Sequence, residues 1–199
     1  MKNSVRFQKA FEGICFELII EAYHQALEKK EFQLNWNEND FSELLSFYVN
    51  ENELSLKKGI TSKTEQKLLK STDQQSKGFA DKLKRIDFVF FKIWRELRYE
   101  YFFEAKNLKQ NDSALKRRYI DTGINSFVSA KYKNGSLIGY LLEGEVSETV
   151  KEINSLLIRD KRNAEILKLG SNNLLKSYFE SNHSGIGTLK HLIFDFTTI

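Results

Sequence analysis

The sequence predicts an α/β domain. Three observations predict this class. Apolar side chains recur at helical spacing over residues 7–30. The runs at 84–94 and 98–106 are rich in Phe, Tyr, Ile and Val, as strands are. A second helical pattern follows those runs. At 199 residues the chain suits a single domain, 1–199, with a substantial core.

Composition excludes several classes of protein. The content of 16 Phe, 8 Tyr and 2 Trp argues against disorder. No run approaches the roughly 18 apolar residues of a membrane span, and the first residues lack the apolar core of a signal peptide. The single Cys15 cannot form an internal disulfide, so we expect a cytoplasmic protein. Three His and one Cys cannot furnish a four-ligand structural zinc site.

The region between the first helix and the strands is polar and less regular. An Asn or Asp is a common helix cap, and Ser followed three residues later by Glu is a capping box. These signals predict a short helix at 40–49 capped by Asn39 or Asp40, a loop at 50–60, a helix from Ser62 through Glu65 to about Lys70, and an exposed stretch at 71–77.

The connection between the two strand-like runs, residues 95–98, lacks the glycine of a tight primed turn, so we expect a longer or splayed hairpin. His191 is expected on the solvent side of a closing strand, and no Ser-His-Asp set can be identified without geometry. The later elements are predicted as a loop at 107–111, a helix from Asp112 or Ser113 to about Lys131, a strand at 137–143 ended by Gly144, helices at 147–157 and 163–169, and two runs at 174–179 and 189–196 that could extend the sheet.

Two carboxylates and one lysine are expected to gather on the hairpin. Asp87 opens the first run, and Glu104 and Lys106 lie two residues apart in the second. Strand side chains alternate between faces, so Glu104 and Lys106 point the same way. Two nearby carboxylates suit a hard divalent cation, and a lysine beside them can orient a water or stabilise charge on a phosphate. The bland alternative is an amphipathic edge strand with a solvated Glu and Lys.

These residues resemble the signature of the PD-(D/E)xK nuclease superfamily. There an Asp begins one strand and the next carries Glu/Asp-x-Lys, as in Asp87 and Glu104-Ala105-Lys106. The proline of the family name is absent, as in many members. The resemblance implies a restriction-endonuclease-like core, αβββαβ, with a central mixed sheet flanked by helices over residues 7–143. Residues 144–199 would add C-terminal helices and strands. It also implies a further strand before Asp87, which the sequence does not place.

The resemblance further implies the chemistry. Asp87 and Glu104 would hold Mg²⁺ or Mn²⁺ with the Ala105 carbonyl, and Lys106 would orient the attacking water. The protein would then be a metal-dependent nuclease hydrolysing phosphodiester bonds, with DNA the favoured substrate. The alternative is a non-catalytic nucleic-acid- or protein-binding subunit on a decayed nuclease fold.

Glu12 is a fourth candidate catalytic residue. It projects into the apolar arc of the first helix, and a buried carboxylate needs a partner or a metal. Phe11-Glu12 also resembles the Phe-Glu that opens the first helix in several families of the superfamily, where the glutamate lies at the edge of the active site. A Glu that reaches solvent from the helix end is the alternative.

Positive charge is concentrated around the motif. Residues 79–136 contain 13 Lys and Arg against 7 Asp and Glu, whereas the whole chain has a net charge of only +4. Such a surround favours a polyanion such as nucleic acid. Lys116, Arg117 and Arg118 could bind its phosphates, although a solvated helix face would look the same.

The resemblance also suggests a cellular context. Small nucleases without a domain that recognises the target often act in prokaryotic restriction or phage-defence systems, where a protein partner such as an ATPase keeps them inactive. A homodimer is a further possibility. We expect no membrane association.

Overall fold

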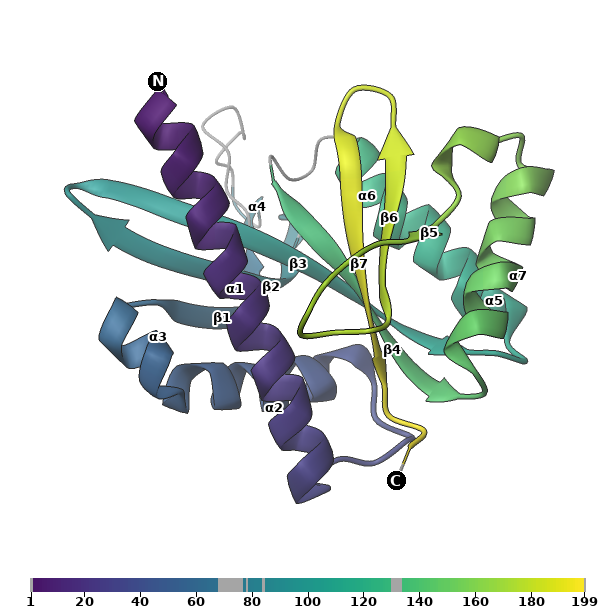
Figure 1. Ribbon diagram of the computed structural model, residues 1–199, viewed down its shortest axis with the longest axis horizontal. Coiled ribbons are helices and arrows are strands. Elements are labelled where there is room, and N and C mark those ends of the chain that lie inside the picture. The colour runs from purple at the N-terminus through teal and green to yellow at the C-terminus, as the bar shows by residue number, and fades with distance from the viewer. Residues whose placement is uncertain (1, 68–76, 78, 84, 130–133, 199) are drawn as a thin grey trace.

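The computed structural model describes residues 2–67, 77, 79–83, 85–129 and 134–198 (Figure 1). Across these residues the fold is α/β, with a mixed seven-stranded sheet in the order β1-β2-β3-β4-β7-β6-β5. The strands are β1 (Thr61–Lys67), β2 (Arg85–Trp94), β3 (Leu97–Lys109), β4 (Gly135–Glu143), β5 (Lys168–Leu169), β6 (Tyr178–His183) and β7 (Gly187–Asp195).

The sheet changes from antiparallel to parallel pairing at β3. Strands β1, β2 and β3 form an antiparallel meander, while β4 runs parallel to both β3 and β7. Antiparallel pairing resumes from β7 to β6 and from β6 to β5. The parallel connection from β3 to β4 passes through a helical crossover, as parallel neighbours require.

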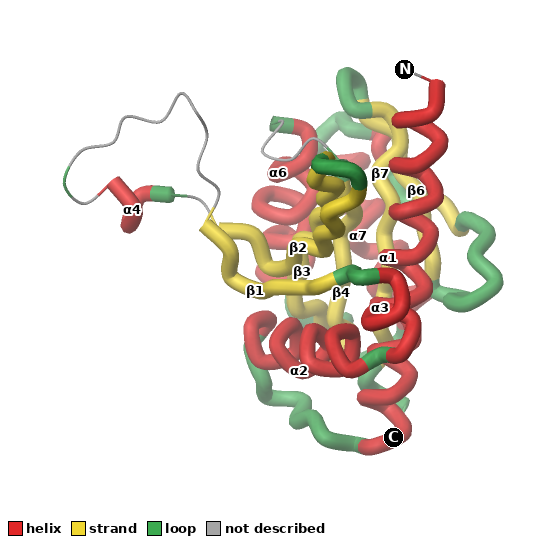
Figure 2. Tube along the Cα trace, turned by 90° about the vertical axis from the view of Figure 1, so that its left-hand side faces the viewer, coloured by secondary structure: helices red, strands yellow, loops and turns green. Residues whose placement is uncertain are grey.

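Helices cover both faces of this sheet (Figures 1 and 2). Within the described part of the chain, none combines the length and apolarity needed to cross a bilayer. The helices are α1 (Lys2–Lys29), α2 (Glu38–Glu51), α3 (Glu53–Lys58), α4 (Phe79–Lys82), α5 (Ser113–Arg118), the π-helical η1 (Tyr119–Ile124), α6 (Asn125–Val128), α7 (Val146–Arg159) and the 3₁₀ turn η2 (Asn163–Glu165).

The sheet separates two apolar cores. On one face, α1 and α2 pack against alternate residues of the central strands, including Phe88, Phe103 and Tyr140. On the other face, η1, α6 and α7 pack against residues such as Val89 and Leu137. Because strand side chains alternate, neighbours in sequence on β2 or β3 face different cores.

The strand implied before Asp87 is β1, in a segment for which the sequence analysis predicted a helix. The capping-box signal at Ser62 and Glu65 was overridden by antiparallel pairing with β2, from Thr61↔Phe91 to Lys67↔Arg85. The Ser62 hydroxyl is buried against that of Ser46, 2.8 Å away. The rest of the predicted helix and the exposed stretch at 71–76 lie outside the described residues.

Two other predictions in this region were wrong. The cap of α2 is Asn37, and Asp40 is the third helical residue, whose carboxylate accepts the Asn37 N–H in a capping box. The predicted loop at 50–60 contains α3, which Asn52 caps at its start. The helix ends at Gly59, where φ is 60° and glycine is unstrained.

The hairpin between β2 and β3 is tight, contrary to the expectation of a splayed connection. Trp94 pairs with Leu97, so only Arg95 and Glu96 form the loop. Both have positive φ, 48° and 65°, as in a type I′ turn, although neither is glycine or asparagine. The absence of glycine therefore misled the prediction.

Several later elements match the predictions, and others differ. Asp112 caps α5 as predicted, through its carboxylate and the N–H groups of Ala114 and Leu115. The expected loop at 107–111 is instead largely the end of β3, and the expected helix at 163–169 is η2 followed by β5. The closing run at 189–196 extends the sheet as β7, whereas the run at 174–179 reaches β6 only with its last two residues, Tyr178 and Phe179. His191 is fully buried rather than exposed.

Candidate functional site

The predicted cluster forms where β2 and β3 separate. Their paired positions end at Phe88↔Phe103, so the next N–H groups of β3 need other acceptors. The Ala105 N–H donates to Oδ2 of Asp87 at 2.7 Å. A side-chain carboxylate thus replaces a carbonyl of the neighbouring strand. Asp87 is thereby held beside the Glu-x-Lys segment.

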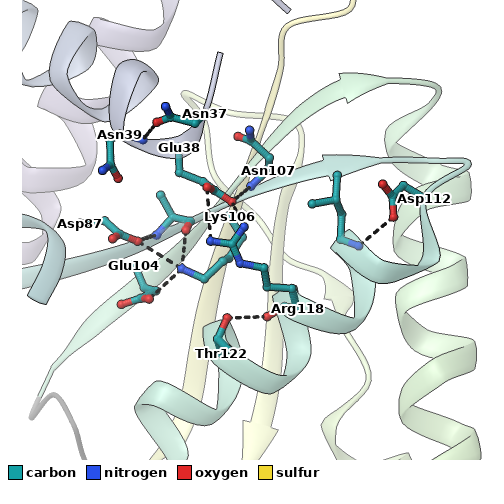
Figure 3. A network of polar contacts seen from close by, with 12 residues as sticks. Asn37, Glu38, Asn39, Asp87, Glu104, Lys106, Asn107, Asp112, Arg118 and Thr122 are labelled. Carbon is teal, nitrogen blue, oxygen red and sulfur yellow. Dashed lines mark hydrogen bonds and ion pairs between the residues drawn. The ribbon is translucent and has the colours of Figure 1, made fainter. Parts of the chain in front are cut away.

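The ammonium of Lys106 lies at the centre of the cluster (Figure 3). Its Nζ is 2.7 Å from Oε1 of Glu104, 3.3 Å from Oδ2 of Asp87 and 2.6 Å from the carbonyl oxygen of Ala105. Three oxygens from two strands therefore converge on one point. The sequence analysis predicted this grouping from strand alternation and from the pairing of the two runs in a hairpin.

The cluster is largely withdrawn from water. The side chains of Glu104 and Lys106 are 7% and 6% exposed, and that of Asp87 is 16% exposed. Burial raises the pKa of Asp87, and the nearby charge of Glu104 raises it further. The Lys106 ammonium and the Ala105 N–H act in the opposite direction on this pKa.

The crossover helix forms the wall beside Lys106. A Cβ placed on Gly123 of η1 would lie 3.5 Å from Cγ of Lys106 and 3.1 Å from the side chain of Leu137. Glycine therefore allows η1 to approach β3 and β4 closely. This π-helical turn packs directly against the stem of the central lysine.

A second polar group adjoins the cluster. The Asn107 N–H donates to Oε1 of Glu38 at 3.0 Å, and the Glu38 carboxylate also pairs with Arg118 at 3.0 Å (Figure 3). Sequence analysis missed Glu38 and Asn107. Their signal was weak, since Glu38 lies in the polar start of a helix far from the motif in sequence.

The donor set fits a hard divalent cation. The oxygens of Asp87, Glu104 and Ala105 already surround one cationic centre, and two carboxylates with a carbonyl are ligands that Mg²⁺ accepts, with waters completing the octahedron. Among the described residues, no group of three or more His, Cys, Asp or Glu side chains is placed to hold a metal. The set is thus two carboxylates and one backbone oxygen.

The structure does not bring Glu12 to this cluster. Glu12 lies on α1, which packs on the face of the sheet that carries Tyr101 and Phe103. Glu104 and Lys106 alternate with those residues and point to the other face. The Glu12 carboxylate instead pairs with the ammonium of Lys190. A salt bridge answers the need for a partner that its position suggested.

The three predicted phosphate-binding residues separate into different environments. Lys116 is buried and bonded to Glu152 at 2.5 Å and to the Gln110 carbonyl, so it cannot reach a ligand as placed. Arg117 pairs with Asp160. Arg118 lies beside the cluster, with its side chain 51% exposed. Of these three residues, only Arg118 lies beside the cluster with an exposed side chain.

The structure also contains a buried chain of hydrogen-bonded polar side chains that the sequence does not predict. Oγ of Ser181 is 2.6 Å from Nε2 of His183 and 2.7 Å from Nε2 of His191. Nδ1 of His183 lies 2.7 Å from Glu165, and Nδ1 of His191 lies 2.9 Å from the Tyr119 hydroxyl. Ser181 is only 1% exposed, which withholds it from a substrate. We therefore assign this chain a structural role.

Comparisons with known proteins add nothing to this description of the site. No protein-family model, curated protein or solved structure matches this chain.

Proposed function

We propose that the protein is a metal-dependent nuclease of the PD-(D/E)xK type. One observation carries the proposal: oxygens of Asp87, Glu104 and Ala105 converge on a single point at the Lys106 ammonium. This is the ligand set and the lysine that the sequence resemblance implies. They come from two adjacent strands and lie within one largely buried cluster.

The order of elements supports the same proposal. Helix α1 precedes the meander β1-β2-β3, a helical crossover follows, and β4 runs parallel to β3. This order agrees with the αβββαβ core that the resemblance implies. The strands β5, β6 and β7 would then be the C-terminal extension.

The proposed chemistry assigns separate roles to the residues. Asp87, Glu104 and the Ala105 carbonyl would hold Mg²⁺ or Mn²⁺, and the bound ion would lower the pKa of a water and neutralise charge on the phosphate. The Lys106 ammonium would orient the attacking water. Its four-carbon stem lets Nζ leave the oxygen centre without movement of the backbone. Arg118 would contact the phosphate beside the reacting one.

The decisive experiment is a cleavage assay with Mg²⁺ or Mn²⁺ on supercoiled plasmid, single-stranded DNA and RNA. We expect Lys106→Ala and Asp87→Asn each to abolish cleavage while leaving the protein folded. Lys109→Ala, the next lysine along β3, is the matched control and should cleave normally. Cleavage by both cluster variants at the wild-type rate would remove the cluster from the reaction.

A non-catalytic binding subunit on the same fold is the second candidate. The observation that favours it is that the Lys106 ammonium already satisfies both carboxylates, as in a structural ion-pair cluster. Metal-linked stability separates the two. A working site should raise the melting temperature with Mg²⁺ or Mn²⁺, and Asp87→Asn should remove that rise. Intact nucleic-acid affinity without a metal response would favour the binding subunit.

The proposed cellular setting rests on the resemblance alone. In this setting the protein would be the effector of a prokaryotic restriction or phage-defence system, and a regulatory partner such as an ATPase would keep it inactive. Size-exclusion chromatography with neighbouring gene products tests it, and failure to co-elute with any of them would count against it.

A further inference from the structure

The outer end of the β2–β3 hairpin exposes apolar side chains to water. The exposed fractions are 71% for Ile93, 57% for Leu97 and 40% for Trp94. Figure 1 shows this end projecting beyond α1, which crosses the sheet. Several large apolar side chains gathered on one protruding turn indicate an interaction surface.

Cations are held in place on the rings of this end. The Trp94 ring stacks on Phe7, with centroids 4.6 Å apart and planes 5° apart, and the Arg95 guanidinium lies 4.7 Å from the Trp94 centroid. Farther along the hairpin, Arg98 lies 5.2 Å from the centroid of Phe91. Cation–π contacts of this kind order a long side chain before any ligand arrives.

The turn itself is built against the local preference. Arg95 and Glu96 hold positive φ values that asparagine and glycine adopt with less strain. Strain at such positions persists where the side chain has a use. At the first of these two positions the side chain is Arg95, whose guanidinium lies over the Trp94 ring.

The same face of β2 links this end to the cluster. Asp87, Phe91 and Ile93 are separated by even numbers of residues and therefore share a face. Lys63 of β1, paired with Val89, also faces this way, and its ammonium lies 5.6 Å from the Phe91 centroid. Ile93 lies six residues beyond Asp87 along β2, a span of about 20 Å. A chain of a few nucleotides can bridge that distance.

We propose that the end of the β2–β3 hairpin is a nucleic-acid-binding finger. Arg98 and Lys63 lie on the face of Asp87, whereas Arg95 lies at the tip over Trp94, on the α1 face. All three contact phosphates of a strand that passes over the turn and continues toward Asp87 and Glu104. The surface charge favours a polyanion over a protein, since this end carries four cations, Lys63, Lys92, Arg95 and Arg98, against two carboxylates, Glu96 and Glu100. Arg98 pairs with Glu100 at 2.7 Å, and the Lys92 ammonium, which donates to the Lys58 carbonyl, keeps its charge. This inference rests on the proposed function, because it names where the substrate of that site is held.

The test is a binding measurement in EDTA, so that cleavage cannot interfere. Fluorescence anisotropy of labelled single-stranded DNA, duplex DNA and RNA is recorded over a range of salt concentrations. The main variant is Arg95→Asn/Glu96→Gly, which installs a favourable turn and leaves the net charge unchanged. We expect it to melt no lower than the wild type. At about 0.1 M salt it should bind about eightfold more weakly, with a log–log salt slope smaller by about one.

A second variant and a control sharpen the result. Lys63→Gln/Arg98→Gln should reduce the salt slope by about two. Lys161→Gly is the control: Lys161 is exposed, has a φ of 60° and lies outside the hairpin, so the change relieves backbone strain and removes one cation. It should bind as the wild type does.

The outcomes separate this proposal from the nuclease proposal. A folded turn variant with wild-type affinity and salt slope would overturn the finger and leave its apolar end to a protein partner. Weaker binding by the turn variant, together with no metal-dependent cleavage by the wild type, would support the finger and overturn the nuclease.

Discussion

At the scale of single residues, the Lys106 ammonium is the counter-ion of Asp87 and Glu104. Its ammonium contacts the same three oxygens that a divalent cation would need. Two buried carboxylates cannot face each other without such a charge, because burial and mutual repulsion both oppose ionisation. If the cluster holds a metal as proposed, ammonium and metal would compete for one place, and binding of the metal would require Lys106 to move.

This competition predicts opposite effects of Lys106→Met with and without metal. Without metal the variant should be less stable by about 3–5 kcal/mol, because two carboxylates lose their buried partner. With millimolar Mg²⁺ or Mn²⁺ its melting temperature should rise more than that of the wild type, because nothing occupies the oxygen centre. Differential scanning fluorimetry checks both, with Lys109→Met as the control. An equal response to metal in variant and wild type would contradict the shared site.

Residue-level prediction from sequence succeeded where one local rule decided the geometry. Strand alternation placed Glu104 and Lys106 together, and pairing of the two runs in a hairpin placed Asp87 beside them. The structure shows the bond from the Ala105 N–H that holds Asp87 there. It failed for Lys116, because a count of charges does not reveal that Glu152 and the Gln110 carbonyl bind that ammonium. Local pattern shows where a side chain points, whereas its partners come from distant segments.

At the scale of elements, β1 shows how pairing overrides local signals. Its sequence, Thr-Ser-Lys-Thr-Glu-Gln-Lys, is polar and carries a capping box, yet it pairs along β2 at the edge of the sheet. An edge strand exposes one long side to water, so it needs little apolar character. The sequence therefore could not distinguish this strand from an exposed helix.

The buried polar chain joins η1, η2, β6 and β7. If Nδ1–H of His183 donates to Glu165, then Nε2 of His183 accepts from Ser181, His191 donates to Ser181, and Tyr119 donates to His191. Every donor then has an acceptor with both histidines neutral. Burial holds the pKa of His191 at about 3, well below its usual value, and burial also lowers the pKa of His183.

This arrangement predicts acid lability with a defined sign. In the unfolded chain His191 binds a proton below about pH 6.5, whereas in the folded chain it stays neutral down to about pH 3. The contribution to stability is therefore complete above pH 6.5 and is lost as the pH falls. The slope is at most about 1.4 kcal/mol per pH unit for this one proton.

Urea unfolding between pH 7 and pH 4 measures that slope. His191→Gln should unfold at lower urea concentration at pH 7 and show a shallower loss of stability on acidification. His24→Gln, at an exposed histidine of α1, should keep the wild-type slope. An unchanged slope in His191→Gln would show that other groups carry the acid lability.

At the scale of the whole molecule, the sheet decides which residues can meet. The α/β class was predictable from periodicity, and the central sheet flanked by helices was an expectation from the resemblance that the structure confirms. The face that each helix covers was not predictable, because a helical pattern identifies the buried side of a helix without saying what covers it. Glu12 was correctly expected to be partly buried, but it lies across the sheet from Asp87 and Glu104.

This separation predicts that Glu12→Gln retains metal-dependent cleavage. The variant loses the pair with Lys190, which should lower the free energy of unfolding by about 1 kcal/mol or less because both side chains are partly exposed. Cleavage rates and urea midpoints, measured beside Glu104→Gln, check both statements. Loss of cleavage in Glu12→Gln with unchanged stability would place Glu12 in the active site after all.

The polar chain around Ser181 has one more consequence, for how the last hairpin finds its alignment. Ser181 and His191 share a face because Ser181 pairs with Leu189 and Phe179 with His191. A slip of β6 by one residue would turn Ser181 and His183 away together, so His191 would lose its contact with Ser181 and His183 its contact with Glu165. These polar contacts therefore favour one alignment of β6 with β7, the strand that pairs with β4.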